Sequence, residues 1–223
     1  MLSFRDVSKT FAMHLQGGVR LPVVQNVTFD VEAGECVVLG GPSGAGKSSV
    51  LKMAYGNYAA DEGAIVVRHD GADTDIAASL PRTVLEVRER TIGYVSQFLR
   101  VVPRVSALDI VAEVAGEANA RDLLSRLNLP ERLWHLPPAT FSGGEQQRVN
   151  IARGLASSHP VLLLDEPTAS LDATNREVVI DLVAEKKRAG TAILAIFHDE
   201  RVRDALATRI VDVTAFAPRA VAA

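Results

Sequence analysis

Long hydrophobic runs are missing from this 223-residue sequence. No apolar run reaches the roughly 18–20 residues that a membrane-spanning helix needs. The longest, Val161–Leu164 and Ala192–Phe197, have the length of buried strands. The N-terminus also lacks a charged segment followed by an apolar one, which predicts that there is no signal peptide. We therefore expect no direct insertion into a membrane.

Cysteine and clustered positive charge are scarce as well. The single cysteine, Cys36, excludes an intramolecular disulfide, which is typical of a cytoplasmic protein. Cys36 lies in the apolar run Cys36–Leu39, so we interpret it as a small buried hydrophobic residue. The net charge is −3 and no run rich in lysine and arginine occurs. This composition predicts no nucleic-acid partner.

Apolar segments of two kinds predict an α/β chain. Segments of strand length are Leu2–Val7, Val23–Val31, Cys36–Leu39, Ala64–Arg68, Ile92–Ser96, Val161–Leu164 and Ala192–Phe197. Segments with helical character are Ser49–Tyr55, Ala107–Glu117, Ala120–Leu127, Gly143–Ser157, Asn175–Arg188 and Asp199–Ala207. His69–Ser79 is polar and predicts a hairpin or a surface loop. The alternation of strands and helices after Ser157 predicts a parallel sheet with right-handed crossovers.

A change of pattern divides the chain. From Phe98 onward the pattern is helical until prolines interrupt it near Thr140. We predict one domain over residues 1–223, in which a helical lobe (98–140) is inserted into a catalytic lobe (1–97 and 141–223). The alanine-rich end after Pro218 predicts a loose tail.

A phosphate-binding loop lies between a predicted strand and a predicted helix. The segment Gly41–Ser48 fits G-x-x-x-x-G-K-[ST] without a mismatch. Inward-pointing N–H groups and the start of a helix attract an anion. The Lys47 ammonium suits the β- and γ-phosphates, and the Ser48 hydroxyl suits Mg²⁺. This context argues against a chance glycine-rich turn. The predicted nucleotide contacts are Gly41, Pro42, Ser43, Gly44, Ala45, Gly46, Lys47, Ser48 and Ser49.

Four polar residues follow predicted strands, where a parallel sheet presents its ligand edge. Asp165 and Gln97, with Ser48, are predicted to hold Mg²⁺. Glu166 is predicted to act as general base toward the attacking water. His198 is predicted to sense the γ-phosphate, although a lone histidine is usually structural. Lys47, Gln97, Glu166 and His198 form the predicted catalytic set.

A second loop-to-helix junction occurs at Ser142-Gly143-Gly144-Glu145, preceded by Phe141. Ser142 is a good N-cap, and Glu145 at the third helical position predicts a capping box. The two glycines leave the first backbone N–H groups accessible, which predicts a second anion-binding helix start.

Together these segments resemble the nucleotide-binding domain of the ATP-binding-cassette (ABC) ATPases over nearly the whole chain. The resemblance implies a P-loop NTPase fold with a parallel or mixed core sheet, an antiparallel β subdomain and a helical lobe. It implies hydrolysis of ATP with Mg²⁺, adenine stacking by Phe11, and a second ABC ATPase domain as partner. In such a dimer, the signature residues Ser142, Gly143, Gly144 and Glu145 complete the partner's ATP site. The resemblance also implies that Asp172, in the Ser170–Asp172 turn, is a nucleotide contact. Three departures are Phe11 instead of tyrosine, Phe141 at the beginning of the signature, and Glu145 instead of the commoner glutamine.

At subfamily level the chain resembles the L-type ATP-binding subunits of the bacterial phosphonate carbon–phosphorus (C–P) lyase system. The supporting segments are His14–Val23, Ser96–Arg104, Pro130–His135 and Ile196–Glu200. That resemblance implies soluble C–P lyase subunits as partners and a link to synthesis of alkylphosphonates that carry a triphosphorylated ribose (α-D-ribose 1-methylphosphonate 5-triphosphate).

Two alternatives stay open. One is the ATP-binding subunit of a transporter coupled to a membrane permease, for which Phe98–Ser106 is the expected docking segment. The other is a nucleotide-responsive scaffold with little turnover, against which the presence of both Glu166 and His198 argues.

Overall fold

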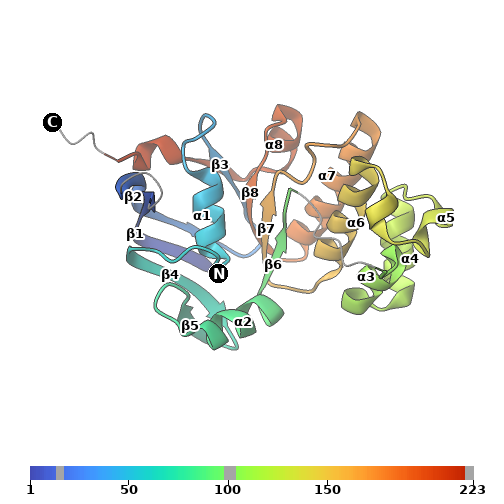
Figure 1. Ribbon diagram of the computed structural model, residues 1–223, viewed down its shortest axis with the longest axis horizontal. Coiled ribbons are helices and arrows are strands. Elements are labelled where there is room, and N and C mark those ends of the chain that lie inside the picture. Colours follow the sequence, from blue (N-terminus) through green and yellow to red (C-terminus); the bar gives the residue numbers. More distant parts are fainter. Residues whose placement is uncertain (14–17, 98–103, 219–223) are drawn as a thin grey trace.

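A parallel sheet and an antiparallel sheet form the framework of the molecule, and a group of helices lies at one end (Figure 1). The computed structural model describes residues 1–13, 18–97 and 104–218. The parallel sheet has the strand order β6-β7-β8-β3-β9, and the antiparallel sheet has the order β2-β1-β4-β5. The predicted fold class is therefore confirmed.

The antiparallel sheet comprises β1 (Leu2–Met13), β2 (Val19–Val31), β4 (Glu62–His69) and β5 (Ala72–Asp75). The parallel sheet comprises β3 (Cys36–Gly40), β6 (Ile92–Val95), β7 (Val161–Asp165), β8 (Ala192–Ile196) and β9 (Arg209–Asp212).

The helices outside the predicted helical lobe are α1 (Lys47–Ala54), α2 (Pro81–Arg90), α6 (Gly143–Ala156), α7 (Ala173–Arg188) and α8 (Glu200–Leu206). Between β6 and α6 lie α3 (Ala107–Ala115), α4 (Glu117–Arg126), α5 (Glu131–Trp134) and the 3₁₀ turn η2 (Pro138–Thr140). A last 3₁₀ turn, η3 (Val213–Phe216), follows β9.

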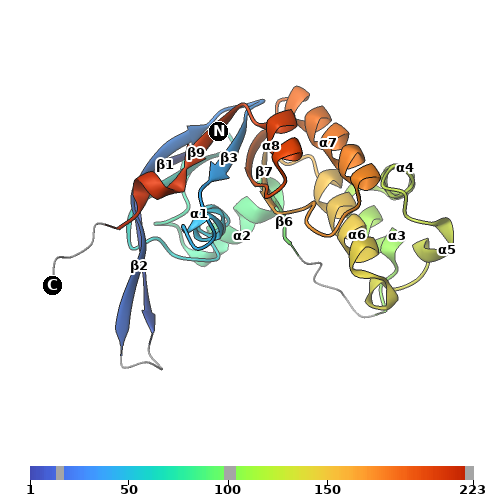
Figure 2. The ribbon, with the colours of Figure 1, turned by 90° about the horizontal axis from the view of Figure 1, so that it is seen from above.

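The central strands separate two hydrophobic cores, because successive side chains of a strand point to opposite faces. Along β7, Val161 and Leu163 join a core with α1 and the antiparallel sheet. Leu162 and Leu164 join the other core, with α3, α4, α6 and α7. All residues of β7 and β8 are buried, as expected for parallel strands covered on both faces. Helices α1 and α6 consequently lie on opposite sides of the parallel sheet (Figure 2).

Cys36 is fully buried in the second core. Burial raises the pKa of its thiol to about 12, so the thiol stays protonated at neutral pH. The interpretation of Cys36 as a small buried hydrophobic residue is confirmed.

Most predicted elements form within a few residues of the predicted limits. The expected hairpin at His69–Ser79 forms between β4 and β5, where Asp70 and Gly71 both have positive φ. The predicted strand Leu2–Val7 continues to Met13 in β1, because β1 pairs with β2 over its whole length. β9 was not predicted: it is short and mostly exposed, and it forms by parallel pairing with β3.

Two helices, α2 and α5, were also missed by the sequence analysis. The charged segment before β6 forms α2, with Pro81 at its first position, where the missing N–H costs little. The short α5 was not predicted either. Residues 14–17, 98–103 and 219–223, which include parts of three predicted segments and the expected loose tail, lie outside the described residues. Within residues 1–13, 18–97 and 104–218, no helix has the length and apolar character that crossing a membrane requires.

Candidate nucleotide site

The phosphate-binding loop joins the end of β3 to the start of α1, as its position in the sequence predicts. Lys47 is buried, with 9% of its surface exposed. Its Nζ donates hydrogen bonds to the carbonyl oxygens of Gly41 (2.7 Å) and Pro42 (2.8 Å). The ammonium is thus held within the loop, and its position is set by the backbone that surrounds it.

Gly46 is required by its conformation and by its neighbours. Its φ is +98°, in the region that glycine adopts at little cost. A Cβ atom at this position would lie 2.8 Å from Val24 Cγ1 and 3.0 Å from Val23 Cγ1 on β2. The antiparallel sheet therefore packs directly against the turn that aims the loop at α1.

The start of α1 presents backbone donors. The first bond of the helix joins the N–H of Val50 to the carbonyl of Gly46 (3.0 Å). The N–H groups of Lys47, Ser48 and Ser49 precede this bond and have no partner inside the helix. Gly46 is the N-cap and makes no side-chain cap. The junction therefore combines a partial positive charge with free donors, as an anion site needs.

Asp165 lies at the end of β7 and is buried, with 8% of its surface exposed. Its Oδ2 accepts a hydrogen bond from the hydroxyl of Tyr94 on β6 (2.8 Å). Burial, followed by the charge of Asp165, raises the pKa of Tyr94, so the hydroxyl remains a donor. Sequence reasoning missed Tyr94. Its signal lies in the sheet register, in which Tyr94 pairs with Leu163, two residues before Asp165.

The donor set at this junction fits Mg²⁺. A hydroxyl (Ser48) and a carboxylate (Asp165) are hard oxygen donors, and Mg²⁺ in nucleotide sites takes few protein ligands because phosphates and waters complete its shell. In the described part of the chain, no group of three or more His, Cys, Asp or Glu side chains is arranged to hold a metal. A dedicated all-protein metal cage is thus not formed by these residues.

Glu166 and His198, from the ends of adjacent strands, form a pair. His198 Nε2 lies 2.7 Å from Glu166 Oε1. Glu166 has a φ of +51°, a conformation that is costly for a residue with a side chain. Its N–H donates to the carbonyl of Ile196 on β8 (3.1 Å), which holds this conformation. Backbone strain of this kind is commonly found at functional sites.

Gln97 is exposed and directly precedes residues 98–103, which lie outside the described residues. The residue before it is tied to α6. Asn150 Nδ2 donates to the carbonyl of Ser96 (2.6 Å), and Gln147 Nε2 reaches the same oxygen at 3.4 Å. Gln147 also donates to the carbonyl of Pro167 (3.0 Å) and is buried. Sequence reasoning missed both α6 residues, since they act through contacts between distant segments.

The predicted capping box at the start of α6 is confirmed. Glu145 N–H donates to Ser142 Oγ, and the backbone N–H of Ser142 donates to Glu145 Oε2 (2.8 Å). The hydrogen bond from the Ser142 side chain, together with that from its backbone, lowers the pKa of Glu145. At Gly143 an added Cβ would meet no atom within 4 Å. The front of this helix start is therefore open.

The remaining predicted contacts, Phe11 and Asp172, lie on different elements. Phe11, on β1, packs edge-on against Tyr58, with ring centroids 5.1 Å apart. Asp172 caps α7, where its Oδ1 accepts from the backbone N–H of Asn175 (2.8 Å). The Ser170–Asp172 turn lies beside the start of α6, since a Cβ at Gly144 would be 3.2 Å from the Ser170 carbonyl. The fold thus brings the strand-end residues together, and the Ser142 and Asp172 segments together.

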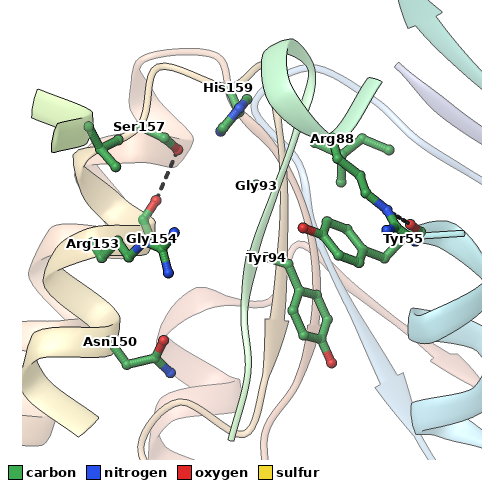
Figure 3. A pocket seen from close by; sticks show the side chains of 11 residues that line it. Tyr55, Arg88, Gly93, Tyr94, Asn150, Arg153, Gly154, Ser157 and His159 are labelled. Atoms are coloured by element: carbon green, nitrogen blue, oxygen red, sulfur yellow. Dashed lines mark hydrogen bonds between the residues drawn. The ribbon is translucent and has the colours of Figure 1, made fainter. Parts of the chain in front are cut away.

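Apart from the nucleotide site, a pocket of about 200 Å³ lies along β6, the edge strand of the parallel sheet (Figure 3). It is bounded by Gly93 and Tyr94 of β6, by Asn150 and Arg153 of α6, and by Arg88 of α2. Arg88 lies 4.6 Å from the centre of the Tyr55 ring, and its Nε donates to the Tyr55 carbonyl (2.8 Å). This pocket is separate from the phosphate-binding loop but shares Asn150 with the contact to Ser96.

Comparisons with known proteins agree with this geometry. The family model described as "ABC transporter" matches residues 24–169. The chain is 43% identical over 189 residues to the lipoprotein-releasing system ATP-binding protein LolD 2 of Caulobacter vibrioides (80% of this chain, 81% of that protein). It is 34% identical over 220 residues to the LolD protein of Myxococcus xanthus (94% and 95%).

Solved structures show the same fold. The dimeric structure of the bacterial ABC transporter cassette MJ0796 superposes with a TM-score of 0.83 at 27% identity, covering 96% of this chain and 95% of that one. A post-hydrolysis state of the same cassette, dimeric and bound to ADP and Pi, gives a TM-score of 0.82 at 28% identity with the same coverage.

Proposed function

The chain belongs to the ABC transporter family of ATPases, and we propose that it is the ATP-hydrolysing subunit of a transporter coupled to a membrane permease. ATPase activity and the use of ATP with Mg²⁺ follow from the family. The relatives named above are ATP-binding proteins of lipoprotein-releasing systems, and this supports the transporter alternative over the phosphonate system. The proposal places the chain at the cytoplasmic face of the membrane.

The observation that carries the proposal is the convergence of the phosphate loop and the strand-end residues at one edge of the parallel sheet. Lys47 and the start of α1 would hold the phosphates, and Ser48, Asp165 and Gln97 would hold Mg²⁺, which neutralises phosphate charge. Glu166 would take the proton of the attacking water, while its contact with His198 orients the carboxylate. Phe11 would stack on the adenine.

A second ATPase domain is part of the proposal. The start of α6 is open at Gly143 and belongs to the core on the far side of the sheet from α1. Two helix starts on opposite sides of one sheet are poorly placed to share one phosphate. We therefore infer that Ser142, Gly143, Gly144 and Glu145, with Asp172, complete the ATP site of a partner domain. The dimeric state of the MJ0796 structures supports this inference.

Ser142→Arg is expected to leave ATP binding by the monomer unchanged and to block ATP-driven dimerisation. The arginine side chain would fill the open front of α6, where the partner's phosphates are proposed to lie. Dimer formation is measured by size-exclusion chromatography with Mg²⁺–ATP in the Glu166→Gln background, in which ATP persists. Ser158→Arg, at an exposed position after the same helix, is the control. Normal dimerisation of Ser142→Arg would contradict the shared site.

The pocket beside β6 is the proposed docking site for a segment of the permease. Arg88 and Arg153 give its walls positive charge, which favours a partner segment that carries carboxylates. Asn150 lines this pocket and bonds the carbonyl of Ser96, the residue before Gln97. Docking at β6 would therefore act on the position of Gln97 at the nucleotide. Phe98–Ser106, the expected docking segment, follows directly, although residues 98–103 lie outside the described residues.

A second candidate partner set is the soluble C–P lyase subunits. It rests on the segments that resemble the L-type subunits of that system, of which Pro130–His135 forms α5 with its flanks and Ile196–Glu200 carries His198. Pro130–His135 contributes no residue to the proposed nucleotide site, so a specific partner would account for that segment. The names of the relatives reported above do not support this candidate.

One pull-down separates the two partner sets. Tagged Glu166→Gln protein is incubated with Mg²⁺–ATP in native cytosol and in solubilised membranes, and bound proteins are identified by mass spectrometry. Recovery of a membrane permease supports the transporter proposal. Recovery of phosphonate-processing enzymes without a permease would replace it with the second candidate. The Lys47→Ala variant is the control for nucleotide-dependent capture.

A further inference from the structure

Arg176, in the second turn of α7, connects the two loops that flank Glu166. Its Nη1 lies 2.9 Å from Asp199 Oδ2, and its Nη2 donates to the carbonyl of Leu171 (3.2 Å). Its Nε is buried and lacks a hydrogen-bond partner. The Arg176 side chain is 27% exposed and the Asp199 side chain 29% exposed, so this ion pair is partly shielded from water. One side chain thus touches the loops after β7 and after β8.

Both contacted loops lead directly to the proposed catalytic pair. Asp199 follows His198, and its Oδ1 caps α8 by accepting from the N–H of Val202 (3.1 Å). His198 in turn contacts Glu166 at 2.7 Å. Leu171 ends the second of two consecutive turns that follow Glu166. In the first, the Ala169 N–H donates to the Glu166 carbonyl (3.3 Å), and in the second the Leu171 N–H donates to the Thr168 carbonyl (3.2 Å). The two loops therefore meet at Arg176 on one side and at the Glu166–His198 contact on the other.

These residues enclose a pocket of about 330 Å³. Its lining consists of Glu166, Thr168, Ala169, Arg176, His198 and Asp199. Glu166, His198 and Arg176 thus share one cavity, in which a shift of either loop would change the separation of the Glu166 and His198 side chains. A displacement on the order of 1 Å at a reacting group is enough to lower a rate about 10²-fold.

A purely structural reading of Arg176 is that it fastens α8 to α7. The chain contains a neighbouring pair that serves this purpose, Glu177 with Arg201, again from α7 to α8. That pair is more exposed, at 45% and 70%, and it touches neither Leu171 nor the pocket. The Arg176 guanidinium differs from that pair because it also donates to the backbone carbonyl of Leu171, in the loop after Glu166. This difference allows the two roles to be tested separately.

We propose that Arg176 is a positioning residue, which holds the loops after β7 and β8 in register so that His198 keeps Glu166 aligned for hydrolysis. The proposal rests on the proposed roles of Glu166 and His198. A guanidinium is suited to this task, because its fixed fork bonds two acceptors at once. Lysine would retain a cation near Asp199 but would not hold both loops.

The test is steady-state ATPase kinetics of the full chain for wild type, Arg176→Ala, Arg176→Lys and Arg201→Ala. We expect Arg176→Ala to lower kcat about tenfold while KM for ATP changes less than about twofold. Arg176→Lys should recover part of the lost kcat. Arg201→Ala should keep kcat within about twofold of wild type, since exposed pairs contribute little. Equal effects of Arg176→Ala and Arg201→Ala on kcat would overturn the proposal.

Asp199→Asn provides a second variant in case Arg176→Ala folds poorly. Asparagine is a good N-cap, so α8 keeps its cap while the ion pair with Arg176 is removed. The same loss of kcat is expected, and wild-type kcat in this variant would count against the proposal. Glu166→Gln is measured alongside. If that variant hydrolyses ATP normally, the catalytic assignment fails, whereas an inactive Glu166→Gln with a fully active Arg176→Ala overturns only the role of Arg176.

Discussion

Glu166→Gln is expected to bind ATP normally and to hydrolyse it about 10²–10⁴-fold more slowly, the usual contribution of a general base. Glutamine has the shape of glutamate but does not accept a proton from water. Because His198 Nε2 can still donate to the amide oxygen, the substitution changes basicity with little change in packing. The strained backbone at Glu166, with φ of +51°, is retained as well, since the Ile196 carbonyl that holds it is unaffected.

A consequence of slow hydrolysis is that ATP remains between two domains. Size-exclusion chromatography of Glu166→Gln with Mg²⁺–ATP should therefore show a stable dimer, and phosphate release should show the loss of turnover. Glu200→Gln is the matched control, because that carboxylate is 83% exposed at the start of α8 and lies near the same loop. If Glu166→Gln releases phosphate at the wild-type rate, Glu166 is not the base.

Lys47→Ala is expected to weaken ATP binding about 10- to 100-fold, since one hydrogen bond to a charged group contributes about 1.5–3 kcal/mol. In the structure the ammonium is buried and bonds the carbonyls of Gly41 and Pro42, so it lies inside the loop that would surround the phosphates. Alanine removes the cation and leaves those two carbonyl oxygens without this donor. The loss should therefore appear in affinity, before any effect on hydrolysis.

Isothermal titration calorimetry with Mg²⁺–ATP measures this loss directly. Lys52→Ala is the matched control, because Lys52 belongs to the last turn of α1 and lies 5.5 Å from the Tyr58 ring. It should bind ATP as wild type does. Melting curves of both variants check that the fold is intact. Wild-type affinity in Lys47→Ala would remove the main support for the phosphate-site assignment.

Sequence reasoning succeeded where a short segment contains all the information. The phosphate loop is recognisable because glycine, lysine and serine are spaced for one turn and one helix start, and Gly46 indeed needs a positive φ. The capping box of Ser142 and Glu145 is local for the same reason, since both partners lie within one helical turn. Buried parallel strands such as β7 are also local, as continuous apolar runs.

Sequence reasoning failed where partners come from distant segments. Tyr94 meets Asp165 only through the register of β6 with β7, and Gln147 joins the loops after β6 and β7 from the middle of α6. β9 was missed because a short exposed strand is defined by its neighbour β3 and not by its own pattern. The resemblance to L-type C–P lyase subunits predicted soluble C–P lyase subunits as partners. The names of the relatives do not support that prediction.

The amino-acid sequence by itself determined the chemistry available to this protein: a phosphate loop, a carboxylate pair after a buried strand, and a second helix start with a capping box and two glycines. These are properties of residues close together in the chain, where backbone geometry limits the outcomes. Only the tertiary structure decided which groups act on each other, such as His198 on Glu166 and Arg176 on the loops beside them. Such contacts depend on the packing of distant elements, because a sheet and its covering helices bring together side chains that no local pattern relates.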